Sequence, residues 1–147
     1  MVAVRKSEVT WDGDLARGIG TVSASTSNAF TNLPVSWASR TEAPDGRTSP
    51  EELVAAAHAS CFAMALSAGL GGAGTPPQKL HVSATVTFDR VGGGWRVISS
   101  ALSVRGRISG IDAAAFQEAA DAAKENCPIS QALKGNVDLS VEASLER

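Results

Sequence analysis

The chain has 147 residues, of which 44% are hydrophobic and 19% are charged, and its formal net charge is −2. This length suits one core, so residues 1–147 are expected to form a single domain, and the composition excludes a disordered chain. The slightly negative charge and the lack of a lysine or arginine cluster argue against a nucleic-acid partner.

The first third of the chain predicts short strands. Residues 5–14 and 17–26 alternate between apolar and polar side chains, and the turn signal Asp12-Gly13-Asp14 separates them. The segment LPVSWAS, residues 33–39, predicts a third strand. Residues 40–48 are polar and contain Pro-Asp-Gly, which predicts a loop.

A charge-free run from Leu53 to Gln78 contains the most apolar predicted helix. Ser49 is a good N-cap, Pro50 suits the first helical position, and Glu52 completes a capping box. Apolar residues surround this helix, which predicts burial on every side. One layer of short strands barely supplies that cover, so the sequence predicts a dimer with this helix in its middle.

The same run raises the question of a membrane. Residues 53–70 are about long enough to span a bilayer and carry no charge. However, seven of them are alanine, and one histidine and two serines interrupt the run. A buried helix is therefore favoured over a membrane-spanning one, and no membrane is expected as a partner. The start MVAVRKSEVTW has no apolar core suited to a signal peptide, and we expect a cytoplasmic protein.

The second half predicts strands and helices in turn. Residues 80–90 and 94–108 alternate and read as a hairpin, and residues 111–126 have the spacing of an amphipathic helix. CPISQALKG, residues 127–135, predicts one short helix, and residues 137–146 predict a last strand. The strands suggest antiparallel hairpins rather than a β-α-β pattern, so the predicted class is α+β.

Cys61 is the first candidate for chemistry. A thiol is a strong nucleophile only as a thiolate, and apolar burial opposes that form. Cys61 lies about three turns into its helix, too far for the helix dipole to help, so it needs a cation from elsewhere. Arg40 and Arg47 are the candidates, and Arg40 is favoured because it follows the apolar VSWAS segment.

Glu51 has no local role like that of Glu52, apart from a favourable contact with the helix dipole. It precedes Cys61 by ten residues, or about 15 Å along one helix, and cannot touch its own Cys61. It could hold an arginine that does, or serve the Cys61 of a second subunit.

His58 lies one turn before Cys61 on the same helix face. This allows a Cys-His hydrolase or a zinc site with Cys127, but neither has the further groups it needs, and a hydrogen-bonded core histidine is favoured. Cys127 begins a short helix, where backbone N–H groups favour a thiolate. One buried and one capping cysteine suit a peroxide-attacking thiol and a resolving thiol.

Together, the segments TSPEELVAAAHASCFAMAL, GID and CPISQAL resemble the OsmC (osmotically inducible protein C) peroxiredoxin family, a sister of the organic hydroperoxide resistance proteins. The likeness covers nearly the whole chain. It implies an OsmC-like fold in an intertwined homodimer, with two buried helices and active sites at the interface.

The resemblance also implies the chemistry. Cys61 would be the peroxidatic thiol, Cys127 the resolving thiol that forms a disulfide with it, Arg40 the cation that stabilises the thiolate, and Glu51 the carboxylate that orients it. The substrate would be an organic hydroperoxide, the reductant a small dithiol or a lipoylated protein, and no metal or other cofactor is expected. The alternatives are another thiol reaction, or a non-catalytic module that binds an apolar ligand at the dimer interface.

Overall fold

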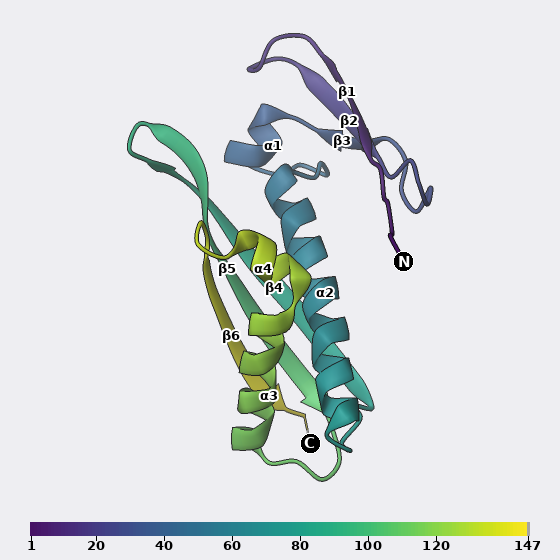
Figure 1. Ribbon diagram of the computed structural model, residues 1–147. Helices are drawn as coiled ribbons and strands as arrows, with labels where there is room; N and C mark the ends of the chain where they lie inside the picture. The colour runs from purple at the N-terminus through teal and green to yellow at the C-terminus, as the bar shows by residue number, and fades with distance from the viewer. Residues whose placement is uncertain (147) are drawn as a thin grey trace. The chain divides into compact units, whose positions relative to one another are not determined.

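A computed structural model describes residues 1–146 of the chain, which has an α+β architecture as the sequence predicts (Figure 1). The chain divides into two compact units, residues 1–53 and residues 54 onward. That they act together as a single domain stays a prediction. The longest helix, α2 (Pro50–Gly72), begins in the first unit and continues into the second.

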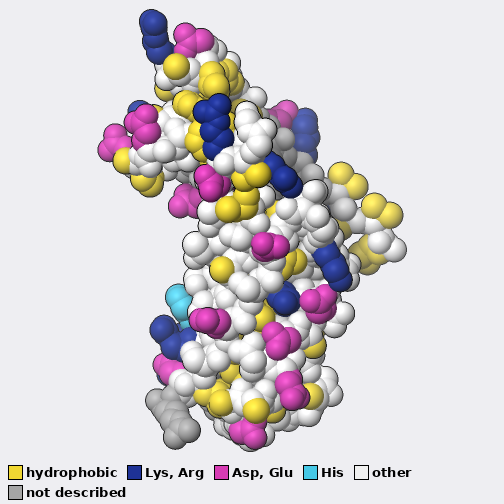
Figure 2. Space-filling view, turned by 90° about the vertical axis from the view of Figure 1, so that its left-hand side faces the viewer, with side chains coloured by type: hydrophobic (Ala, Val, Ile, Leu, Met, Phe, Trp, Pro, Cys, Tyr) yellow, Lys and Arg dark blue, Asp and Glu magenta, His cyan; other side chains and the backbone are white. Residues whose placement is uncertain are grey.

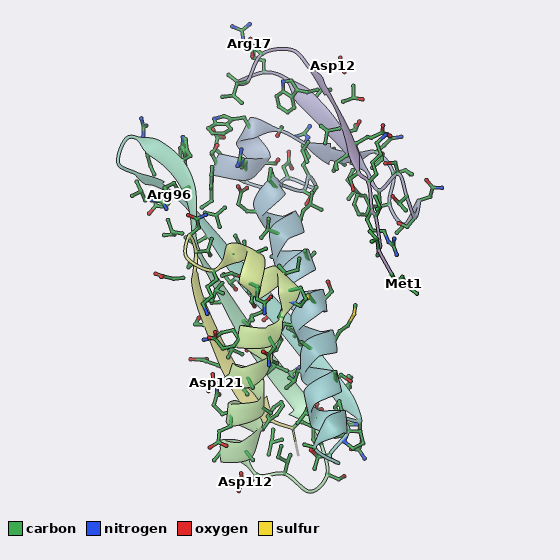
Figure 3. The ribbon with its side chains drawn as sticks, in the orientation of Figure 1. Met1, Asp12, Arg17, Arg96, Asp112 and Asp121 are labelled. Atoms are coloured by element: carbon green, nitrogen blue, oxygen red, sulfur yellow. The ribbon has the colours of Figure 1, made fainter. Side chains whose placement is uncertain are left out.

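The first unit is a small antiparallel sheet. Its strands are β1 (Glu8–Asp12), β2 (Ile19–Ser23) and β3 (Leu33–Val35), in that order. The predicted turn joins the first two strands, and Figure 3 shows Asp12 and Arg17 at that end of the hairpin. The two predicted strands before residue 26 are therefore confirmed.

The third predicted strand is shorter than expected, because a helix replaces its second half. Helix α1 covers Trp37–Thr41. Ser36 and Ser39 cap it reciprocally: the Ser39 N–H donates to the Ser36 hydroxyl at 3.1 Å, and the Ser36 N–H donates to the Ser39 hydroxyl at 3.0 Å. The prediction that Arg40 lies in a loop was therefore wrong, since it lies in the last turn of α1.

Helix α2 starts where the sequence predicts. The Ser49 hydroxyl accepts from the Glu52 N–H at 3.1 Å, and the Glu52 carboxylate accepts from the Thr48 hydroxyl at 2.7 Å. The helix ends at Gly72, and Gly74 follows in the left-handed conformation with φ +84°.

The single chain buries α2 along one side, and the cover of its other side by a second copy stays a prediction. Within the second unit, the fully buried positions form one stripe four residues apart: His58, Phe62, Leu66 and Leu70. The opposite side is exposed in the single chain, including Met64 at 70%. This helix is long and apolar enough to cross a membrane, but core helices of soluble proteins meet the same two criteria. In the single chain, 22% of its most apolar stretch is buried.

The second unit is built on a sheet of order β4-β5-β6. β4 (Lys79–Val91) and β5 (Gly94–Arg107) form the predicted antiparallel hairpin. β6 (Asp138–Leu145) instead pairs with β5 in parallel, so the expectation of only antiparallel pairs was wrong. The physical reason is the crossover through α3 (Ala113–Asn126) and α4 (Pro128–Leu133), which returns the chain in the direction of β5.

The core of the second unit lies between this sheet and the two long helices, α2 and α3, which run along one face of it (Figure 1). Alternate β5 residues are buried, as expected for one covered face. The buried core residues are Phe62, Leu66, Leu70, Leu102, Val104, Phe116, Ala120, Ala123 and Cys127.

Local polar contacts hold α3 in place on the sheet. The Asp112 carboxylate, at the end of α3 marked in Figure 3, accepts from the Ala115 N–H at 2.8 Å. The Gln117 amide donates to the Val141 carbonyl and accepts from the Ala143 N–H, which joins α3 to β6. Acidic and basic side chains are interspersed over the second unit on the face shown in Figure 2.

Candidate active site

The first group of predicted site residues is an ion pair within the first unit. The Arg40 Nε donates to the two Glu51 carboxylate oxygens at 3.0 and 3.1 Å, and Nη2 donates to Oε1 at 2.8 Å. The Glu51 side chain is 9% exposed and that of Arg40 is 32% exposed. This two-pronged contact holds the plane of the guanidinium in one orientation.

The structure distinguishes between the two candidate arginines. Arg40 pairs with Glu51 and also lies over the Trp37 ring, with 5.8 Å between Cζ and the ring centroid. Arg47 is exposed, and its N–H donates to the Pro44 carbonyl in the preceding turn. Arg40 is therefore the arginine that Glu51 positions.

A pocket of about 440 Å³ lies beside this ion pair in the first unit. Apolar side chains make up most of its wall, and Arg40 contributes a charged group to it. Residues from the sheet, from α1 and from the start of α2 line it, among them Val9, Trp11, Val22, Val35, Trp37 and Leu53. An apolar wall with one cation suits a ligand with an apolar body and a polar end.

The second group is the pair of cysteines in the second unit. Cys61 on α2 and Cys127 before α4 are free thiols, and each lies close enough to shift the pKa of the other. Cys127 is fully buried, whereas Cys61 is half-buried at the border between the buried stripe of α2 and its exposed side. The fold thus brings together two sulfurs that are 66 residues apart in the sequence.

The surroundings of the two sulfurs favour a thiolate at Cys127. Burial raises the pKa of Cys61, and the hydrogen bond with Cys127 adds to this, against a smaller opposing effect of the Ile129 N–H. Burial also acts to raise the pKa of Cys127, but the Cys61 thiol, the N–H groups of Ser130 and Ile129, and the Ser130 hydroxyl outweigh it and lower that pKa.

Cys127 immediately precedes α4, so the N–H groups at the start of this helix affect the pKa of its thiol. Among the described residues, Cys127 makes no regular side-chain capping bond to α4. The N–H groups of Ser130 and Ile129 and the Ser130 hydroxyl nevertheless lower the pKa of Cys127 and favour its charged form. Within the second unit, therefore, Cys61 is a thiol that needs a cation before it can act as a nucleophile.

His58 is the hydrogen-bonded core histidine that the sequence favoured. It is fully buried, with Nδ1 2.6 Å from the Ser100 hydroxyl and Nε2 2.8 Å from the Ser130 hydroxyl. Burial lowers the pKa of His58 and keeps the ring neutral. Sequence reasoning missed both serines, because they lie 42 and 72 residues from His58.

The geometry does not support the alternative of zinc. Both ring nitrogens of His58 already contact serine hydroxyls, so the imidazole has no nitrogen to offer a metal together with Cys127. Among residues 1–146, no group of three or more His, Cys, Asp or Glu side chains could hold a metal ion.

Comparison with known proteins assigns the chain to a family. The family model described as OsmC-like protein matches residues 43–142. The peroxiredoxin OsmC of Escherichia coli (strain K12) is 40% identical over 142 residues, which cover 97% of this chain and 98% of that protein. The organic hydroperoxide resistance protein of Xanthomonas axonopodis pv. citri (strain 306) is 30% identical over 95 residues, 64% of this chain and 65% of that protein.

Solved structures show the same fold. The organic hydroperoxide resistance protein OhrB of Bacillus subtilis aligns with a TM-score of 0.73 and 27% identity, covering 95% of this chain and 98% of that one. An OsmC-like protein from Mycoplasma pneumoniae aligns over 100% of both chains with a TM-score of 0.75 and 14% identity, which supports the fold alone. The family and the fold expected from the sequence are confirmed.

Proposed function

The chain belongs to the OsmC-like protein family, and from this premise we propose that it is a cysteine-based peroxidase that reduces organic hydroperoxides with electrons from thiols. One observation carries the proposal: Cys61 and Cys127 are free thiols close enough for each to shift the pKa of the other, with different exposure and different surroundings. Relatives named as a peroxiredoxin and as an organic hydroperoxide resistance protein support the same reaction class.

The reaction proceeds in three steps. The Cys61 thiolate attacks the terminal peroxide oxygen, the O–O bond breaks, and the products are an alcohol and a Cys61 sulfenic acid. The Cys127 thiolate then attacks the Cys61 sulfur and expels the hydroxyl group as water once it is protonated, which leaves a Cys61–Cys127 disulfide. Two thiols of an external reductant return the disulfide to the two free cysteines and are themselves oxidised to a disulfide.

Arg40 supplies a cation to Cys61, whose pKa its described surroundings raise, and Glu51 holds Arg40 in position. Glu51 and Cys61 are ten residues apart on one helix, or about 15 Å by the helical rise. A site that contains both is most simply assembled from two chains, with Arg40 and Glu51 of one chain facing the Cys61 of a second copy.

The exposed side of α2 supports a homodimer. It consists of small residues and one methionine at helical spacing, which we define as the α2 outer face: Ala57, Ser60, Met64, Ser67, Ala68 and Gly71. Small side chains allow two helices to approach closely, and this apolar surface needs a cover that the single chain does not give. A second copy of α2 supplies that cover and places its own exposed side against the border where Cys61 lies.

The apolar pocket beside Arg40 supports an organic substrate rather than hydrogen peroxide. Its wall would contact the alkyl or aryl part of a hydroperoxide, while the cation would lie near the reacting oxygens. Each buried methylene group contributes about 0.8 kcal/mol, so a larger organic part improves binding. We also propose that the protein is cytoplasmic and that its reductant is a small dithiol or a lipoylated protein.

A steady-state peroxidase assay with a panel of thiol reductants tests the proposal. We expect wild-type protein to consume cumene hydroperoxide catalytically with at least one dithiol, and Cys61→Ser to show no consumption above the reductant alone. Binding of cumene hydroperoxide or its alcohol without turnover, and without loss of free thiols, would instead support the non-catalytic binding module.

A further inference from the structure

The buried hydrogen-bonded chain Ser100–His58–Ser130 ends on α4, one turn after Cys127, and the reaction described above assigns it no step. Its two contacts are short, 2.6 Å from Ser100 to Nδ1 and 2.8 Å from Ser130 to Nε2, and all three side chains are fully or almost fully buried. Buried polar chains of this kind order their members tightly, because each unsatisfied group would be costly.

The direction of the protons in this chain follows from the chemistry of a neutral imidazole. One ring nitrogen is a donor and the other an acceptor, so one serine must donate to His58 and the other must accept from it. Ser130 lies one turn after Cys127 in α4, and its hydroxyl lowers the pKa of Cys127. This hydroxyl can give its proton to the Cys127 sulfur only if Nε2–H of His58 donates to it, and then Ser100 donates to Nδ1.

We propose that the Ser100–His58–Ser130 chain is a positioning device that turns the Ser130 hydroxyl proton toward Cys127 and makes Cys127 the leaving sulfur when the disulfide is reduced. The inference rests on the proposed peroxidase function, since it concerns the Cys61–Cys127 disulfide. His58 acts through Ser130 and touches neither sulfur in this mechanism.

The consequence concerns which sulfur the reductant attacks. A disulfide breaks fastest toward the sulfur that is better stabilised as a thiolate. The reductant thiolate therefore bonds to the Cys61 sulfur, and the S–S bond breaks. Its electron pair leaves on Cys127 as a thiolate, which the Ser130 hydroxyl and the α4 N–H groups stabilise. The second thiol of the reductant then attacks the mixed disulfide, releases Cys61 and completes the two-electron transfer.

The exposure of the two cysteines agrees with this direction. Cys127 is fully buried, whereas Cys61 is half-buried in the single chain. Within its own unit, therefore, the Cys127 sulfur is closed to an external thiol, whereas the Cys61 sulfur is not. Accessibility and leaving-group stabilisation thus both favour attack at the Cys61 sulfur and departure of the Cys127 sulfur.

Titration of Cys127 alone tests the device without any peroxide. The chain has two cysteines, so Cys61→Ser leaves Cys127 as the single thiol, whose thiolate absorbs near 240 nm. In that background we expect Ser130→Ala to raise the pKa of Cys127, Ser100→Ala to raise it less, and the exposed Ser83→Ala to leave it unchanged. The Ser100→Ala result is decisive, because Ser100 contacts His58 and can act on Cys127 only through His58 and Ser130. An unchanged pKa of Cys127 in Ser100→Ala overturns the proposal, whatever Ser130→Ala shows.

The tautomer of His58 provides a second readout. The chain contains two histidines, and His81 is exposed on β4 and serves as an internal reference. Nitrogen-15 NMR of the reduced wild type should show His58 protonated at Nε2, and a ring protonated at Nδ1 contradicts the proposed direction. Both readouts use reduced protein, so they stand or fall independently of peroxidase activity.

The disulfide step itself is measured in oxidised wild type. Treatment with a monothiol should trap the mixed disulfide on Cys61, located by peptide mass spectrometry, and trapping on Cys127 would overturn the inference. Loss of the hydrogen bond from Ser130 to the departing sulfur should slow reduction in Ser130→Ala about three- to tenfold.

Discussion

Glu51→Gln is the change that most sharply probes the ion pair beside the pocket. The substitution keeps the size of the side chain but replaces one carboxylate oxygen with an amide that cannot accept from Arg40. The wild-type pair is held by three contacts of 2.8 to 3.1 Å on a carboxylate that is 9% exposed. The variant therefore loosens the guanidinium without removing its charge.

The expected magnitude follows from these contacts. A hydrogen bond to a charged group contributes about 1.5–3 kcal/mol, and the 32% exposure of the Arg40 side chain favours the low end because of solvent screening. About 1.4 kcal/mol corresponds to a factor of ten. We thus expect kcat/KM for cumene hydroperoxide to fall about tenfold in Glu51→Gln.

The neighbouring residue offers a matched control. Glu52 is exposed and contacts Thr48, so Glu52→Gln should stay within about twofold of wild type. Arg40→Lys, which keeps the charge but loses the planar fork, should resemble Glu51→Gln. Urea unfolding verifies that each variant is folded at the assay temperature. Equal rates in folded Glu51→Gln and Glu52→Gln would refute a positioning role for Glu51.

Further predictions concern the thiols, the substrate and the dimer. Cys127→Ser should consume about one equivalent of hydroperoxide and stop as a Cys61 sulfenic acid, detected with a dimedone-type reagent; repeated turnover would show that Cys127 is not the resolving thiol. Comparison of kcat/KM should favour cumene and tert-butyl hydroperoxide over hydrogen peroxide by at least about tenfold, because each buried methylene contributes about 0.8 kcal/mol, and equal values would count against the pocket. Mixed dimers of Cys61→Ser and Arg40→Ala chains should recover about half of wild-type activity if sites are shared, and an inactive dimer verified as mixed excludes sharing. Met64→Glu on the α2 outer face should shift the protein to monomers in light scattering, whereas an unchanged mass would exclude this face as the interface.

Much of the fold follows from local signals. The S-x-x-E pattern at Ser49 marks the start of α2, and the glycines after Val91 mark the β4–β5 turn. Helix α1 escaped prediction because Ser39, rather than a glutamate, closes its capping box. The parallel direction of β6 also escaped, because the alternation of a strand shows which side chains are covered but not which way the strand runs.

The site shows the same division. Cys61, Cys127, Arg40 and Glu51 stand out because their residue types and local positions are unusual. The serines that contact His58 do not, because serine is common in strands and short helices and a contact across many residues leaves no local pattern. The sequence predicts that the single chain does not cover α2 completely, but not which side stays exposed, since an apolar helix looks the same in sequence whether its own chain or a second copy covers a given side.

The central claim is that Cys61 and Cys127 together reduce one hydroperoxide at a time. The most direct measurement adds one equivalent of cumene hydroperoxide to reduced wild type, without reductant, and follows alcohol, free thiols and intact mass together. The account predicts one alcohol formed, two free thiols lost, a mass lower by two hydrogens, and a single linked peptide pair containing Cys61 and Cys127. Unreacted peroxide with both thiols intact would contradict it.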